Sequence, residues 1–339
     1  MSDKNINYTL NSIKFICAIL VIFIHCRFPD LFGNIVVAIS RVAVPFFFMC
    51  SGYFCFYNES GKLLKKLPGK VKHVLIITVI TIVCYFVWGC ILRIFGSSGD
   101  IRYWLFEELF TFQSFIDWLV FNNDPIAGPF WFLFALIYCY LAIYFVERFN
   151  LYKLFYCLIP ICLVTNIFLS EFSYLLEMDI SIIYYRNFFL TGFPFFLLGH
   201  LLNSKSLFSG KKVISIILFT VGVILSILEF MLAGSSLLYI GTILMAIGMF
   251  GIAINYPGIG SKSLSRAARY TLYMYCIHWI LIDVLAIIAR WTGASDLVVW
   301  GYIMPLIIVI LSLCGSVLID VIVNWLKKRF LKKHSPHVL

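Results

Sequence analysis

The chain has 339 residues, of which 62% are hydrophobic and 12% are charged, and its net charge at pH 7 is +10. A mean hydropathy of +0.99 excludes an ordinary water-soluble domain, which would expose far too much apolar surface. The basic residues lie in short loops between apolar runs, so the positive-inside bias explains them and nucleic-acid binding is not expected. The eleven cysteines show no C-x-x-C spacing and are interpreted as small core residues.

Ten segments are apolar and long enough to be predicted as transmembrane helices. They cover about residues 10–28, 34–57, 73–95, 129–146, 151–170, 186–203, 212–231, 236–255, 270–290 and 297–326. The lysine-rich loops and tails fall on one side of these segments, and the positive-inside bias makes this side the cytoplasmic one, with both the N- and the C-terminus. We therefore expect an all-α polytopic membrane protein with a single domain over residues 1–339.

The longest stretch outside these segments, residues 96–128, contains the sequence IRYWLFEELFTFQSFIDWLVF. Its apolar residues recur at helical spacing with Glu107, Glu108 and Asp117 between them. This pattern predicts an amphipathic segment on the outer surface of the membrane. No internal repeat is evident, which argues against a transporter built from inverted repeats.

The segment 11–28, NSIKFICAILVIFIHCRF, carries two ionisable side chains, Lys14 and His25. Eleven residues turn an α-helix through about 1100°, which is three turns plus about 20°, so both side chains lie on one face about 16 Å apart along the axis. A charged side chain in hydrocarbon costs at least ~2.5 kcal/mol and therefore predicts a functional site. The plain alternatives are a Lys14 stem that snorkels to the cytoplasmic interface and a His25 at the outer interface.

The second segment contains Arg41, about 10 Å by helical rise from its outer boundary, and the charge of an arginine cannot be lost. We expect His25 and Arg41 to share one depth, so the catalytic candidates are His25, Lys14 and Arg41. Pro45 frees backbone groups in the same segment, and Ser51 beside Gly52 permits the close approach of a ligand or a neighbouring helix.

Other polar residues at the ends of helices or inside them are candidates for substrate binding: Arg186, Asn187, Trp131, Ser51, His278 and Asp283. For Trp131, at the outer start of the fourth segment, an aromatic-belt role is the usual alternative. Asp320 is a candidate partner for Lys14, because both lie near the cytoplasmic side. The sequence has no metal-ligand spacing, Walker loop, nucleophile elbow or dinucleotide fingerprint, so no metal is expected and any chemistry depends on histidine, arginine and lysine.

Four features follow one another along the chain: the Lys14 to His25 spacing, RVAVPFFFMCSGYF in the second segment, GPFWFLFALIY in the fourth, and RNFFLTGFPFFLLG together with the later YTLYMYCIHWIL. In this order they resemble the acyltransferase type 3 family of bacterial integral-membrane acyltransferases. The resemblance extends over about residues 8–326.

Two departures from the family pattern concern the donor side. The family usually has arginine where Lys14 stands, and lysine keeps the charge but lacks the planar fork for bidentate binding. Where the family typically has two arginines three residues apart, this chain has KVKHVL, which leaves Lys70 and His73 as the candidates for donor binding. RVAVPFFFMCSGYF is also similar to the membrane portion of membrane-bound serine racemases, which is thought to handle an amino acid.

The resemblance implies a multi-pass enzyme of the bacterial cytoplasmic (inner) membrane. It would move an acetyl or other short acyl group from cytoplasmic acyl-CoA to a hydroxyl of a cell-envelope glycan or a lipid-linked saccharide. His25 fits the role of general base or of a transiently acylated nucleophile, Arg41 or Arg186 that of oxyanion stabiliser, and Lys14 that of a charge near the donor phosphates. The loop lysines 62–72 would attract the donor, although orientation in the membrane explains them equally.

Two other classes of function compete with the acyltransferase hypothesis. A transporter of small solutes such as serine should have broken helices at the midplane and internal symmetry. A structural membrane scaffold should not need five basic residues in or at the edge of lipid.

Overall fold

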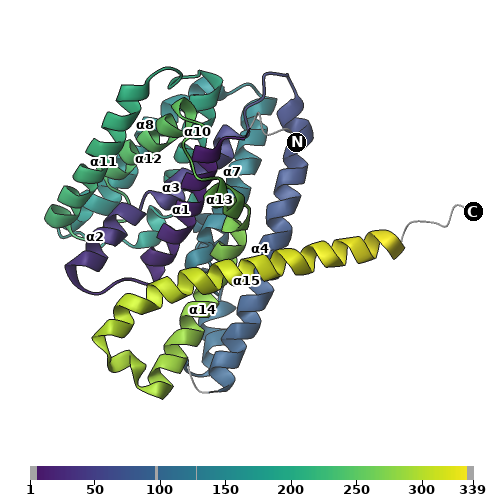
Figure 1. Ribbon diagram of the computed structural model, residues 1–339, viewed down its shortest axis with the longest axis vertical. Helices are drawn as coiled ribbons and strands as arrows, with labels where there is room; N and C mark the ends of the chain where they lie inside the picture. Colours follow the sequence, from purple (N-terminus) through teal and green to yellow (C-terminus); the bar gives the residue numbers. More distant parts are fainter. Residues whose placement is uncertain (1–5, 96–97, 127, 334–339) are drawn as a thin grey trace, which may run out of the picture. The chain divides into compact units, whose positions relative to one another are not determined.

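The computed structural model describes residues 6–95, 98–126 and 128–333 and shows helices without strands over these residues (Figure 1). Within them, eight helices are long and apolar enough to cross a membrane, and three shorter apolar helices accompany them. The protein is an all-α polytopic membrane protein, as expected from its composition. The chain forms two compact units, one containing residues up to Ser40 and from Tyr256 onward, the other containing Arg41–Asn255.

The first unit is built from α1 (Tyr8–His25), α2 (Asp30–Ser40), α13 (Lys262–Ala267), α14 (Thr271–Thr292) and α15 (Val298–Lys333). α1 packs against α13 and α14, and the contact with α13 is visible in Figure 1. Hydrogen bonds hold the start of α1, because the Thr9 hydroxyl donates to the Tyr256 carbonyl and Ser12 Oγ donates to the Ser261 carbonyl at 3.1 Å. Residues 247 and 249 positions apart in the sequence are thereby brought together.

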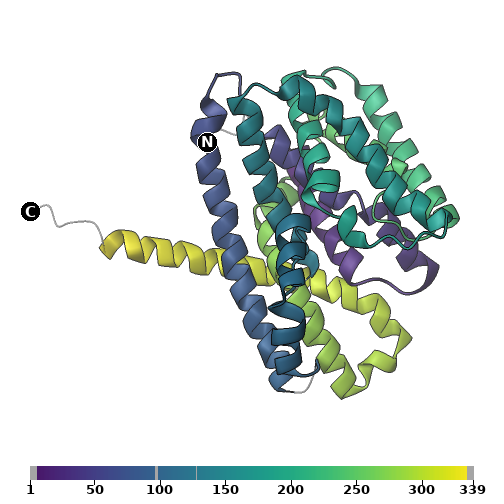
Figure 2. The ribbon, with the colours of Figure 1, turned by 180° about the vertical axis from the view of Figure 1, so that it is seen from behind.

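The second unit contains the remaining helices. They are α3 (Ala43–Tyr53), α4 (Lys62–Ile94), α5 (Ile101–Tyr103), α6 (Phe112–Phe121), α7 (Trp131–Arg148), α8 (Tyr152–Ile167), α9 (Ser173–Leu175), α10 (Phe193–Ser204), α11 (Lys212–Ala233) and α12 (Ile240–Asn255). π-helical turns cover Trp104–Leu109, Phe168–Phe172 and Phe188–Gly192. The main pairs are α11 with α12, α3 with α10, and α4 with α7, and α4 and α7 run side by side in both views (Figures 1 and 2).

Glycines allow α3 and α10 to pack backbone against backbone. A Cβ on Gly52 would lie 1.8 Å from the Phe196 carbonyl oxygen, and a Cβ on Gly199 would lie 2.0 Å from the Met49 carbonyl oxygen. Small residues at helix interfaces are the usual means of close packing in membranes. The close approach expected at Gly52 is therefore present, and the neighbour is a helix.

Two differences from the expected segments have physical reasons. The second segment is interrupted at Arg41 and Val42, between α2 and α3. The Pro45 ring has no N–H for the Arg41 carbonyl four residues earlier and collides with it, which breaks the helix at this point. α4 begins at Lys62 and α15 ends at Lys333, beyond the apolar segments, because hydropathy marks the portion suited to lipid and not the full helix.

Candidate functional site

His25 ends α1 and lies against two aromatic rings of α14 in the first unit. Its ring centroid is 5.3 Å from that of His278 and 5.2 Å from that of Trp279, and the Trp279 ring meets it edge to face at 82°. Helices α1 and α14 therefore bring together two histidines that are 253 positions apart. Trp279 did not stand out in the sequence, because a tryptophan in an apolar run is ordinary.

The His278 side chain is completely buried on α14. Its Nδ1 lies 2.7 Å from the Tyr275 carbonyl oxygen, which can only accept, so Nδ1 carries the proton. In the neutral ring Nε2 is then an acceptor, and among the described residues it has no hydrogen-bond partner. A buried acceptor of this kind beside His25 supports the choice of His278 as a site residue.

Lys14 lies away from the histidine pair, half-buried on α1 three helical turns before His25. Asp283 follows Trp279 by four residues, about 40° around α14, so it lies on the face of α14 that carries Trp279. The Asp320 carboxylate lies 3.9 Å from Nη2 of Arg269, which belongs to the segment between α13 and α14. The predicted ion pair between Asp320 and Lys14 is therefore wrong.

In the second unit, Arg186 and Trp131 form one cluster near the predicted outer side. The Arg186 guanidinium lies 6.0 Å from the centre of the Trp131 ring, and Arg186 Nη2 donates to Asn123 Oδ1 at 3.2 Å. Burial raises the pKa of the neighbouring Tyr185, while the guanidinium groups of Arg186 and Arg41 oppose this rise. Arg41, in the break between helices, is therefore close enough to this cluster to act on it electrostatically.

Two buried carboxyl groups extend this cluster and were missed in the sequence. Tyr239 interacts electrostatically with Arg41 and with both Glu171 and Glu229. Glu229 Oε2 accepts from the Gly241 N–H at 2.9 Å, so it stabilises the N-terminus of α12. Glu171 is only 5% exposed, and its Oε2 has no hydrogen-bond partner among the described residues. Buried groups without partners are rare and predict a ligand or ordered water.

Two more unused polar atoms lie close to Glu171 in the sequence. Ser170 Oγ, on the residue before it, and Asn166 Oδ1, about one turn earlier, are also buried and without hydrogen-bond partners in the described part of the chain. The π-helical turn Phe168–Phe172 shifts the helix register here, as such turns often do at functional sites. The signal in the sequence is a glutamate at the end of an apolar run.

The side chains of Asn187 and Ser51 are used within the fold. Asn187 Oδ1 accepts from the Phe189 and Leu190 N–H groups, both at 3.0 Å, and its Nδ2 donates to the Ile183 and Tyr184 carbonyls. Ser51 Oγ donates to the Phe47 carbonyl at 3.0 Å. These contacts give Asn187 the role of a helix cap, so it supports Arg186 from the adjacent position in the chain.

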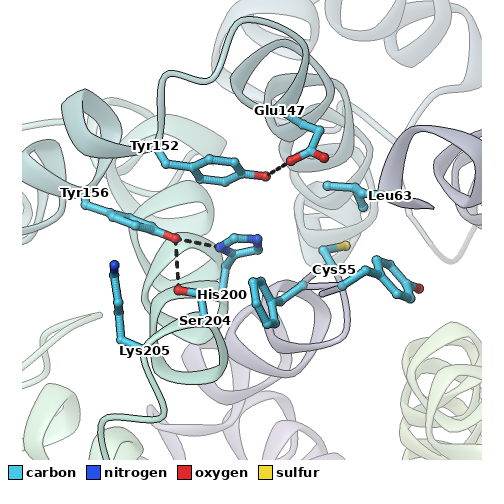
Figure 3. Close-up of a pocket in the computed structure, with 10 residues that line it drawn as sticks. Cys55, Leu63, Glu147, Tyr152, Tyr156, His200, Ser204 and Lys205 are labelled. Atoms are coloured by element: carbon cyan, nitrogen blue, oxygen red, sulfur yellow. Dashed lines mark hydrogen bonds between the residues drawn. The ribbon is translucent and has the colours of Figure 1, made fainter. Parts of the chain in front are cut away.

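A cavity of about 240 Å³ lies where α3, α7, α8 and α10 reach the predicted cytoplasmic side (Figure 3). The His200 ring, nearly buried, stacks on Tyr152 with centroids 4.8 Å apart, and its Nδ1 lies 2.8 Å from the Tyr156 hydroxyl. Tyr152 in turn donates to Glu147 Oε2 at 2.5 Å, and Tyr156 Oη lies 3.2 Å from Ser204 Oγ. The cavity combines aromatic walls with a fixed set of polar groups, as ligand sites do.

Lys70 lies at the edge of this cavity, whereas His73 does not. Lys70 Nζ donates to the Phe54 carbonyl at 2.6 Å and lies 3.6 Å from the Sγ atom of Cys55, a residue of the cavity wall. His73 is exposed on α4. Sequence reasoning did not select His200, which ends the apolar run FPFFLLGH.

Comparison with known proteins identifies the family of the chain. Residues 7–325 match the family model described as acyltransferase domain, the acyltransferase type 3 model. No curated protein and no solved structure matches the chain.

Proposed function

The chain belongs to the acyltransferase type 3 family and is a membrane acyltransferase, and on that premise we propose that it transfers a short acyl group, acetyl in the simplest case. The proposed donor is cytoplasmic acyl-CoA, and the proposed acceptor is a hydroxyl of a cell-envelope glycan or a lipid-linked saccharide in the bacterial inner membrane. The family does not favour a transporter of amino acids.

The observation that carries this proposal is the His25 imidazole against His278 and Trp279 at the end of a membrane-spanning helix. Imidazole is the natural general base for a hydroxyl at neutral pH and contributes about 10² to 10⁴ in rate. His25 takes the proton of the acceptor hydroxyl as its oxygen attacks the thioester carbonyl. The thiolate of coenzyme A then leaves and takes the proton from the imidazolium, so the products are an ester and the free thiol.

The donor side is supported by the cavity lined by His200, Tyr152 and Tyr156. The cavity opens on the side where the positive-inside rule places the cytoplasm. Lys205 lies on its rim, and Lys70 contacts Cys55, a residue of its wall. Lysines are point charges that attract phosphate groups, and coenzyme A carries several. Lys14, in the cytoplasmic half of α1, would add a further charge for the donor.

The acceptor side is supported by the outer cluster of Arg41, Arg186, Trp131 and Glu171. Sugars bind through hydroxyl groups that both donate and accept, and through ring faces that pack on aromatic side chains. Glu171 Oε2 supplies an unused acceptor, and the two guanidinium groups supply donors. The same guanidinium groups would stabilise a negative charge that develops during transfer.

The test uses purified protein in detergent and acetyl-coenzyme A, with products measured by mass spectrometry. We expect release of coenzyme A by the wild type, with the acyl group passed to a saccharide hydroxyl added as acceptor or to water, at a rate that falls on acidification as the imidazole is protonated. His25→Ala should abolish it while the protein still inserts and purifies. Ile16→Ala is the matched control, because Ile16 lies nine residues away and therefore on the opposite face of α1, where it is 43% exposed.

The outcomes separate the classes of function. Substantial turnover by His25→Ala would show that His25 is not the base. Uptake of serine into liposomes without any turnover of coenzyme A would exclude the proposed reaction altogether. Mass spectrometry of envelope glycans from cells with and without the gene identifies the acceptor by the loss of an ester-linked acyl group.

A further inference from the structure

A second cavity, of about 410 Å³, lies in the second unit beside the segment that connects α4 to α7. Its walls come from Ile82 on α4, Phe134 on α7, Leu109 and Trp118 on the helical segment 101–121, and Ile126 after it. The Trp118 and Phe134 rings meet edge to face with centroids 5.3 Å apart. The volume is within the range of small-molecule sites, and the side chains that dominate the walls are apolar.

The polar side chains of these walls bond mainly within the fold, and Asp124, which is buried, is the charged residue among them. Thr111 Oγ1 donates to Ser114 Oγ at 2.8 Å, and Ser114 Oγ donates to the Glu108 carbonyl. Asp124 Oδ1 accepts from the Ile126 N–H at 2.9 Å. An occupant of the cavity therefore finds few polar atoms to bond, and apolar cavities do not hold water well. The chemistry of the site selects a hydrocarbon.

The mouth of the cavity opens on a surface suited to lipid. Phe110 and Phe115 line the cavity and are also exposed by 68% and 52%. On α4, next to Ile82, Ile80 and Val83 are exposed too. Exposed apolar surface of this extent in a membrane-spanning chain faces lipid, so hydrocarbon chains are the neighbours of this opening.

We propose that this cavity, lined by Ile82, Leu109, Trp118, Ile126 and Phe134, binds one hydrocarbon chain of a membrane lipid. The loop that closes the cavity also carries Asn123, which accepts from Arg186 Nη2 at 3.2 Å. A chain held here therefore places its lipid next to the outer cluster. Two lipids carry such chains, a bilayer phospholipid and a lipid-linked saccharide, and the experiment distinguishes them. The site itself does not depend on the proposed reaction.

The test reconstitutes the full-length protein in nanodiscs that contain a photoactivatable probe. One sample contains a phosphatidylethanolamine with a diazirine near the end of one acyl chain, and the other a diazirine-bearing polyprenyl phosphate. After irradiation, peptide mapping by mass spectrometry locates the labelled residues. We expect labels within residues 109–126 and around Phe134, and the sample that labels them more efficiently identifies the source of the chain.

Ile126→Trp is designed to fill the cavity, and Ile82→Phe is a milder filling variant if the first does not fold. The matched control is Ile80→Trp, which adds the same ring to an exposed position of α4 outside the cavity. The filling variants should lose most of the labelling at residues 109–126, whereas the control keeps it. Absence of labels there with both probes, or equal labelling of filled and wild-type protein, would overturn the proposal.

Discussion

Gly199→Ala tests whether the backbone contact between α3 and α10 holds the cavity beside His200, the proposed site of the donor. The new Cβ would lie 2.0 Å from the Met49 carbonyl oxygen, about 1.4 Å inside the 3.4 Å at which ordinary contact begins. No side chain can move aside, because the opposing atom is backbone. The helices must separate by more than 1 Å, which would also stretch the 2.8 Å bond from Asn203 Nδ2 to the Tyr53 carbonyl.

Overpacking of this kind costs about 1–3 kcal/mol and sometimes more. Because the new Cβ meets backbone and not a side chain, we expect Gly199→Ala to lower the free energy of unfolding by about 3 kcal/mol, the upper end of this range. The neighbouring His200 ring would also leave its stack with Tyr152, so the affinity for coenzyme A should fall with stability.

The assay is thermal unfolding in detergent, followed by size-exclusion chromatography with fluorescence detection, together with calorimetric binding of coenzyme A. The control is Gly69→Ala in α4, whose Cβ would meet no atom within 4 Å. This change should be neutral or stabilising by roughly 0.5–1 kcal/mol, because alanine favours a helix over glycine. A Gly199→Ala midpoint equal to that of the wild type would refute the reasoning about the α3–α10 contact.

Three further predictions address single side chains. Lys14→Arg should keep substantial transfer, whereas Lys14→Met should raise the apparent KM for acyl-CoA more than it lowers the thermal midpoint; an unchanged KM would indicate a snorkelling lysine. Glu171→Gln should raise the KM for the acceptor and leave thermal stability nearly unchanged, whereas Glu229→Gln should lower stability by about 1 kcal/mol through the N-terminus of α12, and the opposite pattern would reverse the two roles. His278→Ala should lower kcat while calorimetry shows unchanged binding of coenzyme A, and a kcat equal to that of the wild type would remove His278 from the site.

Some features of the site follow from local sequence alone. The spacing of Lys14 and His25 places both on one face of a helix whatever packs against it, because helical periodicity is a local property. The apolar segments likewise predict membrane-spanning helices without knowledge of their neighbours. Trp131 and Arg186 were selected one by one from their positions at helix ends, and the structure adds that they lie together.

The other features depend on which helices meet. The break at Arg41 has a local cause in Pro45, yet its surroundings include Tyr185 and Tyr239, which lie in distant segments of the chain just before a π-helical turn and α12. The sequence predicts Asn187 as a substrate ligand, and the structure adds that its side chain caps the π-helical turn that follows it. In both cases the sequence shows a polar residue, and the identity of its partner decides its role.

The amino-acid sequence by itself determined that this chain is an all-helical membrane protein and which of its faces carry charge, because hydropathy and helical periodicity are summed over neighbouring residues. Only the tertiary structure decided that His25 meets His278 and Trp279, that Asp320 lies beside Arg269, and that His200 lines a cavity. Helices in lipid have similar apolar surfaces, so hydrophobicity does not select their partners. The choice depends on small residues such as Gly199 and on individual hydrogen bonds, whose two halves lie far apart in the sequence.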